Sequence, residues 1–274
     1  MTEFCFESIN WSPFFGHTRS SLFSLSEAAA RAGFSWISFD EQLLNAAAAQ
    51  SQPQSSVRAA VESAGLRTLA VHSLAITGDA ERDAATAAPL ISAACELGAL
   101  YLHCGVTTAV DDLVRASTRR VARLARDSGV SIAIEFLPFL PVDSISTARA
   151  IVEACEDDQA GLVVDAWHFF HGPDGWTELE SLRPEEIAYV QFDDHGPLKS
   201  SDLMAETTNR RVFPGQGEFD LERFSQTIGR VGWNGVVGLE HLSEDSRNRD
   251  PLEVAIELMK HSKPFWDGHE NAPR

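Results

Sequence analysis

Eight alternations between a short apolar run and a longer segment rich in Ala, Leu, Arg and Glu organise this 274-residue sequence. Short apolar or β-branched runs are typical of buried strands, and the segments between them carry apolar residues at helical spacing. The predicted strands cover residues 4–9, 34–39, 67–72, 99–104, 131–136, 161–165, 187–192 and 235–240. The predicted helices cover residues 22–32, 55–65, 83–97, 110–128, 145–157, 177–182, 220–231 and 251–262.

Strands that alternate with helices pair in parallel, because each helix carries the chain back to the same edge of the sheet. Eight such units in about 250 residues are typical of an α/β protein with a (β/α)8 TIM barrel. The competing open, doubly wound sheet usually has fewer strands and a glycine-rich first turn, and no G-x-G-x-x-G or Walker A sequence follows a predicted strand. We predict one TIM-barrel domain over residues 1–274, with a core of about 3–263 and a peripheral tail at 264–274.

The charge balance excludes several kinds of partner. Lys and Arg number 22 against 40 Asp and Glu, a formal net charge of −18. A surface this acidic repels phosphate backbones and anionic lipid, so we expect neither nucleic acid nor a membrane as a partner. The sequence has no signal-peptide pattern, no apolar run near the ~18 residues of a membrane span, and four scattered cysteines in apolar stretches. We expect a cytoplasmic protein with reduced core cysteines, which could form a homo-oligomer.

Polar side chains end nearly every predicted strand, and in a TIM barrel the strand ends at the carboxyl face carry the function. One such residue alone is usually a helix cap or a solvated loop acid, but their joint occurrence indicates a site. The strand-end residues are Glu7, Asp40, Glu41, His72, His103, Glu135, Asp165, Gln191, Asp193 and Glu240. The longest irregular segment, residues 193–219, follows the seventh strand, where a loop over an active site is expected.

Three of these carboxylates, Glu135, Asp165 and Glu240, end buried apolar strands. Acids that converge in a low-dielectric cavity repel one another unless a cation neutralises them, so a divalent metal is expected. The alternative is that each acid pairs with a nearby arginine. On strand seven Gln191 is the first candidate for a fourth ligand, ahead of Asp193 and then His195. An oxygen-only set favours Mn²⁺ or Mg²⁺, with Co²⁺ or Zn²⁺ as alternatives.

Other residues at the same end are candidates for binding a small carbonyl substrate. His168 lies three residues after Asp165, so a tight turn would place both at the barrel mouth. Arg211, or alternatively Arg210, precedes a Pro-Gly turn and could hold an anionic group. The further candidates are His72, His103 and Trp167 as substrate contacts, and Trp11, Phe14, Phe15, Trp167 and Phe169 as an apolar wall.

Together these motifs resemble the xylose-isomerase-like TIM barrels, a family of sugar phosphate isomerases and epimerases. The carriers are IAIEF on strand five, DAWH on strand six, VQFDD on strand seven, R-x-x-PGQG at 211–217 and GLE on strand eight. The resemblance implies one divalent metal bound by Glu135, Asp165, the strand-seven residue and Glu240. In epimerase members of the family the two glutamates form the proton-transfer pair.

Strand seven departs from the commoner family pattern. Many isomerases and epimerases of the family have His there, and Gln191 resembles instead the 3-dehydroshikimate dehydratase branch. The endonuclease IV branch of the same fold implies a histidine-rich trinuclear zinc site, and both the missing histidine set and the charge of −18 argue against it.

Three functions follow from these observations. The first is a divalent-metal-dependent isomerase or epimerase of a sugar, keto-polyol or related carbonyl compound that acts through an enediolate. Glu135, Glu240 and His168 are its candidate catalytic groups, with His168 and Arg211 orienting the substrate. The second is a lyase of the 3-dehydroshikimate dehydratase type, in which His168 is the base and Arg211 holds a carboxylate. The third is a non-catalytic barrel or a subunit of a larger enzyme.

Overall fold

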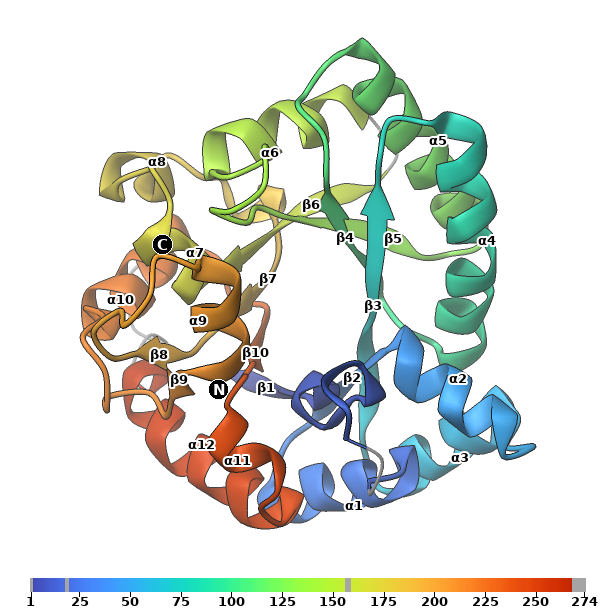
Figure 1. Ribbon diagram of the computed structural model, residues 1–274, viewed down its shortest axis with the longest axis vertical. Helices are drawn as coiled ribbons and strands as arrows, with labels where there is room; N and C mark the ends of the chain where they lie inside the picture. Colours follow the sequence, from blue (N-terminus) through green and yellow to red (C-terminus); the bar gives the residue numbers. More distant parts are fainter. Residues whose placement is uncertain (1, 18–19, 156–158, 268–274) are drawn as a thin grey trace.

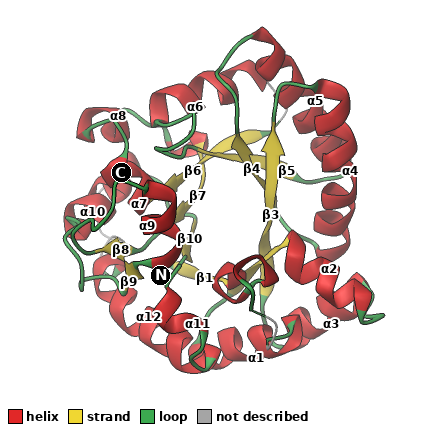
Figure 2. Cartoon of the chain, viewed as in Figure 1, coloured by secondary structure: helices red, strands yellow, loops and turns green. Residues whose placement is uncertain are grey.

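Eight parallel strands close into a barrel surrounded by helices (Figures 1 and 2) in this computed structural model, which describes residues 2–17, 20–155 and 159–267. Around the barrel the strands run in the order β1-β10-β7-β6-β5-β4-β3-β2, so the first strand pairs in parallel with both the second and the last. The strands are β1 (Glu3–Glu7), β2 (Trp36–Asp40), β3 (Arg67–Ile76), β4 (Tyr101–Val106), β5 (Ser131–Glu135), β6 (Ala160–Asp165), β7 (Ile187–Gln191) and β10 (Val236–Leu239). The predicted (β/α)8 TIM barrel is confirmed.

The helices surround the barrel in Figure 2 and contribute buried apolar side chains to the core. They are α1 (Leu22–Ala32), α2 (Glu41–Ala49), α3 (Gln54–Ser63), α4 (Ala80–Leu97), α5 (Asp112–Asp127), α6 (Ile145–Val152), α7 (Ala166–His171), α8 (Trp176–Glu180), α9 (Leu203–Asn209), α10 (Leu221–Val231), α11 (Glu244–Arg247) and α12 (Pro251–Trp266). Each predicted helix has a counterpart. α1 ends at Gly33, whose φ of 92° is a left-handed conformation that suits glycine.

The sequence did not predict α2, α7, α9 or α11, nor the two-residue strands β8 (Asp194–His195) and β9 (Arg211–Val212). Most of these elements are too short for a periodic pattern, so tertiary contacts decide whether they form. Asp40 takes the ordinary role of a strand-end acid. Its carboxylate accepts hydrogen bonds from the backbone N–H groups of Gln42 and Leu43 and caps α2.

Two sequence expectations need correction at the periphery. The core does not stop at residue 263, because α12 continues to Trp266, whose buried ring lies 5.3 Å from that of Phe192. The rest of the predicted tail, 268–274, lies outside the described residues. Cys95 is exposed on α4, whereas the other three cysteines are buried as expected. Among the described residues no helix has both the length and the apolar character that crossing a membrane requires.

Candidate active site

A cavity of about 240 Å³ opens at the carboxyl ends of the barrel strands. Its walls divide into an apolar rim and a polar base. The rim carries Phe14, Phe15, Phe139, Leu140, Met204 and Leu242. The base carries His72, His103, Glu135, His168, Arg211 and Glu240. A small molecule that fits this cavity therefore meets hydrocarbon near the entrance and ionisable groups below it.

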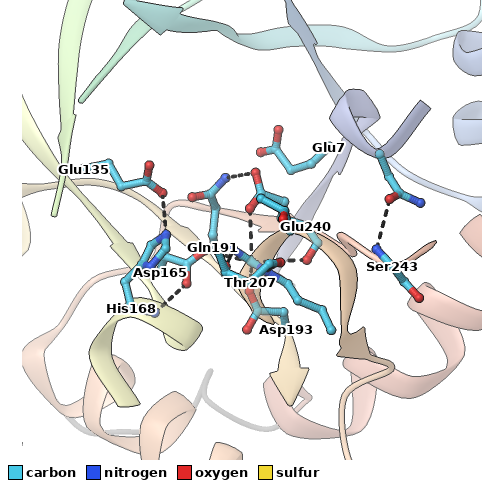
Figure 3. Close-up of polar contacts among 12 residues, drawn as sticks. Glu7, Glu135, Asp165, His168, Gln191, Asp193, Thr207, Glu240 and Ser243 are labelled. Carbon is cyan, nitrogen blue, oxygen red and sulfur yellow. Dashed lines mark hydrogen bonds and ion pairs between the residues drawn. The ribbon is translucent and has the colours of Figure 1, made fainter. Parts of the chain in front are cut away.

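Glu135, Asp165 and His168 form one cluster, with ligand atoms that all lie within 4.8 Å of one another. α7 begins directly after β6, so His168 lies about one turn beyond Asp165, and its backbone N–H donates to Oδ1 of Asp165 over 2.9 Å. Nε2 of His168 lies 3.4 Å from Oε1 of Glu135 (Figure 3). Asp165 and His168 therefore lie close together, as the sequence predicted. Glu135 joins them from the neighbouring strand β5.

Gln191 joins Glu240 to this cluster. β7 lies between β6 and β10, and its register pairs Gln191 with Asp165 on one side and with Gly238 on the other. The amide Nε2 of Gln191 donates to Oε1 of Glu240 over 3.0 Å (Figure 3), while its buried Oε1 has no hydrogen-bond partner among the described residues. An acceptor of this kind, buried among carboxylates, matches a bound cation or a donor from a ligand.

Arg211 supplies the positive charge of the site. Its Nη1 lies 3.1 Å from Oδ2 of Asp165 and 3.0 Å from Oε2 of Glu240, and it also pairs with Asp193. Its Nη2 donates to Oγ1 of Thr207 over 2.9 Å. Arg211 is thus the shared counterion of Asp165, Asp193 and Glu240. Between the two arginines left open by the sequence, Arg211 lies at the site.

The remaining candidates lie elsewhere. Arg210 pairs with Glu206, which also lies 3.3 Å from the buried His195. Trp167 is fully buried and stacks on His171 at 4.1 Å, and it is absent from the described lining of the cavity. The expectation that Trp167 contacts substrate is therefore corrected to a packing role. Of the expected apolar wall, Phe14 and Phe15 line the cavity, whereas Trp11 and Phe169 are buried core residues.

The loop that carries Arg211 is held by Asp194, the second acid of the VQFDD motif. Its carboxylate accepts hydrogen bonds from the backbone N–H groups of His195, Gly215, Gly217 and Phe219. A Cβ on Gly217 would lie 2.2 Å from Oδ1 of Asp194, so only glycine fits there. β8 and β9 pair antiparallel, with His195 opposite Arg211. The two motifs VQFDD and R-x-x-PGQG therefore form one structural unit.

Burial and neighbouring charges shift the pKa values of these groups in different directions. Burial raises the pKa of Glu240, and Asp165 and Glu135 add to a rise that Arg211 opposes, which brings it to about 7. Burial also acts to raise the pKa of Glu135, but His103 and His168 outweigh it and hold that pKa well below its ordinary value. Burial lowers the pKa of His168, yet Asp165 and Glu135 leave it raised. The two glutamates therefore differ in protonation near neutral pH.

The opposite wall contains residues that the sequence interpretation did not connect. Nε2 of His72 lies 3.1 Å from Oε2 of Glu7, and the His72 ring stacks on His103 at 4.4 Å. His103 in turn contacts the hydroxyl of Tyr189 through Nδ1 and Oε2 of Glu135 through Nε2. Tyr189 was not a candidate, although its place two residues before Gln191 puts it on the same inward face of β7 and could have identified it.

Comparisons with known proteins agree with this fold. The family model described as xylose isomerase-like TIM barrel matches residues 26–264. Inosose isomerase of Bacillus licheniformis is 30% identical over 145 residues, which cover 50% of this chain and 51% of that protein. The 3-dehydroshikimate dehydratase of Pseudomonas aeruginosa is 29% identical over 149 residues, which cover 54% of this chain and 23% of that protein. The match thus spans about half the length of the inosose isomerase and less of the dehydratase.

A solved structure, the IolI protein with a bound zinc atom, aligns with a TM-score of 0.83. The alignment covers 99% of this chain and 100% of that one at 19% identity. At this identity the similarity concerns the barrel fold.

Proposed function

The chain belongs to the xylose isomerase-like TIM barrel family, and we propose that it is a divalent-metal-dependent isomerase or epimerase of a sugar, keto-polyol or related carbonyl compound, acting through an enediolate. The observation that carries this proposal is the pair of glutamates at the base of one cavity. In the metal-free chain Glu135 has a lowered pKa and Glu240 has a pKa of about 7, so the two carboxyl groups differ in their affinity for a proton. Such a pair suits proton removal at one position and proton return at another.

The chemistry of the surrounding donors fits a divalent cation. Glu135, Asp165, Gln191 and Glu240 would hold it through oxygen atoms, and Oε1 of Gln191 has no partner among the described residues. Oxygen donors favour Mn²⁺ or Mg²⁺, and Zn²⁺ and Co²⁺ remain alternatives, since zinc binds the structurally similar IolI protein. When bound, the cation would act as a Lewis acid toward the substrate carbonyl.

Glu135 and Glu240 carry out the two halves of the proton transfer. The ionised Glu135 takes the proton α to the carbonyl, and Glu240 returns a proton on the other face or at the neighbouring carbon. Each such transfer typically contributes roughly 10²–10⁴-fold in rate. His168 lines the cavity, and its Nε2 lies 3.4 Å from Oε1 of Glu135, so this imidazole is placed beside the proton-transfer group to orient a substrate oxygen.

A neutral substrate suits the cavity better than an anionic one. Among the described residues that line it, Arg211 is the only arginine or lysine, and its Nη1 is taken up by Asp165, Asp193 and Glu240. A phosphate or carboxylate would enter an acidic cavity whose guanidinium group is already paired with carboxylates. This favours an uncharged keto-polyol, and inosose isomerase is among the relatives.

The second candidate is a lyase of the 3-dehydroshikimate dehydratase type. Gln191 on β7 and the similarity to the Pseudomonas aeruginosa dehydratase support it. In that reaction His168 would be the base and Arg211 would bind the substrate carboxylate. To do so, Arg211 must break one or more of its ion pairs with Asp165, Asp193 and Glu240.

Proton–deuterium exchange at the carbon α to the carbonyl tests both candidates. The purified chain is loaded with Mn²⁺ or Mg²⁺ and screened against neutral ketoses, cyclic polyhydroxyketones and 3-dehydroshikimate. Exchange or turnover of a neutral ketone supports the first proposal, and protocatechuate absorbance from 3-dehydroshikimate supports the second. Glu240→Gln is the matched variant. If the wild type shows neither exchange nor turnover and Glu240→Gln leaves the metal content unchanged, the chain is a non-catalytic barrel or a subunit of a larger enzyme.

A further inference from the structure

We propose that Tyr189 and His103 act as positioning residues for Glu135. In this arrangement the Tyr189 hydroxyl selects one tautomer of the His103 ring, and the ring then holds one oxygen of the Glu135 carboxylate. The inference rests on the proposed function of Glu135 in proton transfer. It replaces the sequence-based expectation that His103 contacts the substrate.

The three residues form a buried chain of hydrogen bonds across the barrel interior. Tyr189 lies on β7, His103 on β4 and Glu135 at the end of β5, and two strands, β5 and β6, separate β4 from β7. The Tyr189 hydroxyl contacts Nδ1 of His103, and Nε2 of His103 lies 3.0 Å from Oε2 of Glu135. Tyr189 is fully buried and His103 is 2% exposed, so the bond between the phenol and the imidazole is shielded from water.

The direction of both bonds follows from the carboxylate of Glu135. An ionised carboxylate can only accept, so the bond over 3.0 Å requires a proton on Nε2 of His103. In the neutral ring Nδ1 is then the acceptor, and the Tyr189 hydroxyl donates to it. An Nε2–H group can donate to the carboxylate of Glu135, whereas the other tautomer would set two lone pairs against each other at 3.0 Å.

This donation fixes how Glu135 presents its other oxygen. Oε2 is held by His103, and Oε1 lies on the side of His168, at 3.4 Å from Nε2. Both nitrogens of His103 are engaged by protein groups, and its ring face stacks on His72. His103 therefore has no ring nitrogen left for a substrate, and its effect on the reaction passes through Glu135.

Tyr189→Phe tests this chain of hydrogen bonds, because it removes the hydroxyl of Tyr189 and keeps the ring. The matched control is Tyr101→Phe, which removes the same atom from the only other tyrosine of the sequence, with its ring 5.6 Å from that of Tyr189. The first measurement is the ¹⁵N spectrum of histidine-labelled protein, with the His103 signals assigned by their loss in His103→Gln. We expect a neutral ring protonated at Nε2 in the wild type and in Tyr101→Phe, and loss of this single form in Tyr189→Phe.

The second measurement is kinetic, on whichever substrate of the exchange screen reacts. Partners that orient a metal-binding or catalytic group typically contribute 10- to 100-fold, so kcat of Tyr189→Phe should fall by roughly tenfold or more while KM stays within about twofold. His103→Gln keeps an N–H donor and should retain more activity than His103→Leu, which keeps none.

Several outcomes overturn the proposal. They are a wild-type His103 protonated at Nδ1 or at both nitrogens, a tautomer unchanged in Tyr189→Phe, and a kcat equal to that of Tyr101→Phe. If Tyr189→Phe does not fold, the comparison of His103→Gln with His103→Leu decides. A wild-type chain that exchanges no proton with any substrate contradicts the proposed function, and the ¹⁵N measurement then still decides whether the tautomer is selected.

Discussion

Nη1 of Arg211 lies 3.1 Å from Oδ2 of Asp165, although the two residues are 46 positions apart in the sequence. Asp165 ends β6, and Arg211 reaches it from β9, which is tied to β8 beyond the seventh strand of the barrel. The same nitrogen also contacts Glu240. Arg211 and a divalent cation would therefore draw on the same carboxylates, and the balance between them can be tested.

Removing this guanidinium should destabilise the protein strongly. Arg211→Met leaves Asp165, Asp193 and Glu240 buried without their shared counterion, and breaking a buried ion pair typically costs about 3–5 kcal/mol. Urea denaturation in the presence of a chelator measures the loss in the free energy of unfolding. Arg31→Met is the control, since this exposed pair with Glu27 should contribute less than about 1 kcal/mol. Added Mn²⁺ should restore part of the stability of Arg211→Met, and equal stability of both variants would contradict the assignment.

Metal binding should become tighter with rising pH up to about 7. Glu240 has a pKa of about 7 against an ordinary 4.5, so between these values the folded chain holds a proton that the unfolded chain has lost. The stability of the metal-free protein therefore falls as pH rises through this window. Since a cation needs the carboxylate, binding releases about one proton below pH 7, and affinity should rise about tenfold per pH unit there.

Calorimetric titration of Mn²⁺ at several pH values, in two buffers of different ionisation enthalpy, counts the protons released. Glu240→Gln should bind more weakly with a flatter pH dependence. A wild-type affinity that does not change between pH 5 and pH 7 would show that Glu240 is not a ligand.

Gly217 should not tolerate a side chain. A Cβ at this position would collide with the Asp194 carboxylate at 2.2 Å, so Gly217→Ala should cost about 1–3 kcal/mol and displace the loop that carries Arg211. Thermal unfolding and kcat measure the two effects. Gly196→Ala lies in the same segment with no atom within 4 Å of the added carbon, and it should be nearly neutral. Equal behaviour of both variants would mean that Asp194 does not organise the loop.

The residue at position 191 should influence which metal binds. Gln191→His offers an imidazole nitrogen in place of an amide oxygen and should shift the preference from Mn²⁺ toward Zn²⁺, because imidazole suits zinc better. Gln191→Leu removes the donor and should weaken binding of both ions. Competition titrations with a chromophoric chelator give the two affinities. If the Zn²⁺/Mn²⁺ affinity ratio is the same for Gln and His, the side chain does not reach the cation.

Local patterns in the sequence were sufficient for the barrel and for the acids at its mouth. An apolar run followed by a polar residue marks the end of a buried strand, and parallel strands bring all such ends to one face. Glu135, Asp165 and Glu240 could therefore be placed from the sequence. His168 followed as well, because a turn after a strand keeps residues three apart close together.

What the tertiary structure decided is the set of contacts between these residues. Arg211 reaches Asp193 because β8 pairs with β9, and both strands are too short for any periodic signal. Tyr189 and His103 are 86 positions apart, and only closure of the barrel brings the phenol to the imidazole. The sequence determined which strand-end residues lie at the barrel mouth, because strand alternation is local. The tertiary structure decided which of these side chains contact one another, because the distances between them depend on strand register and loop packing across the whole chain.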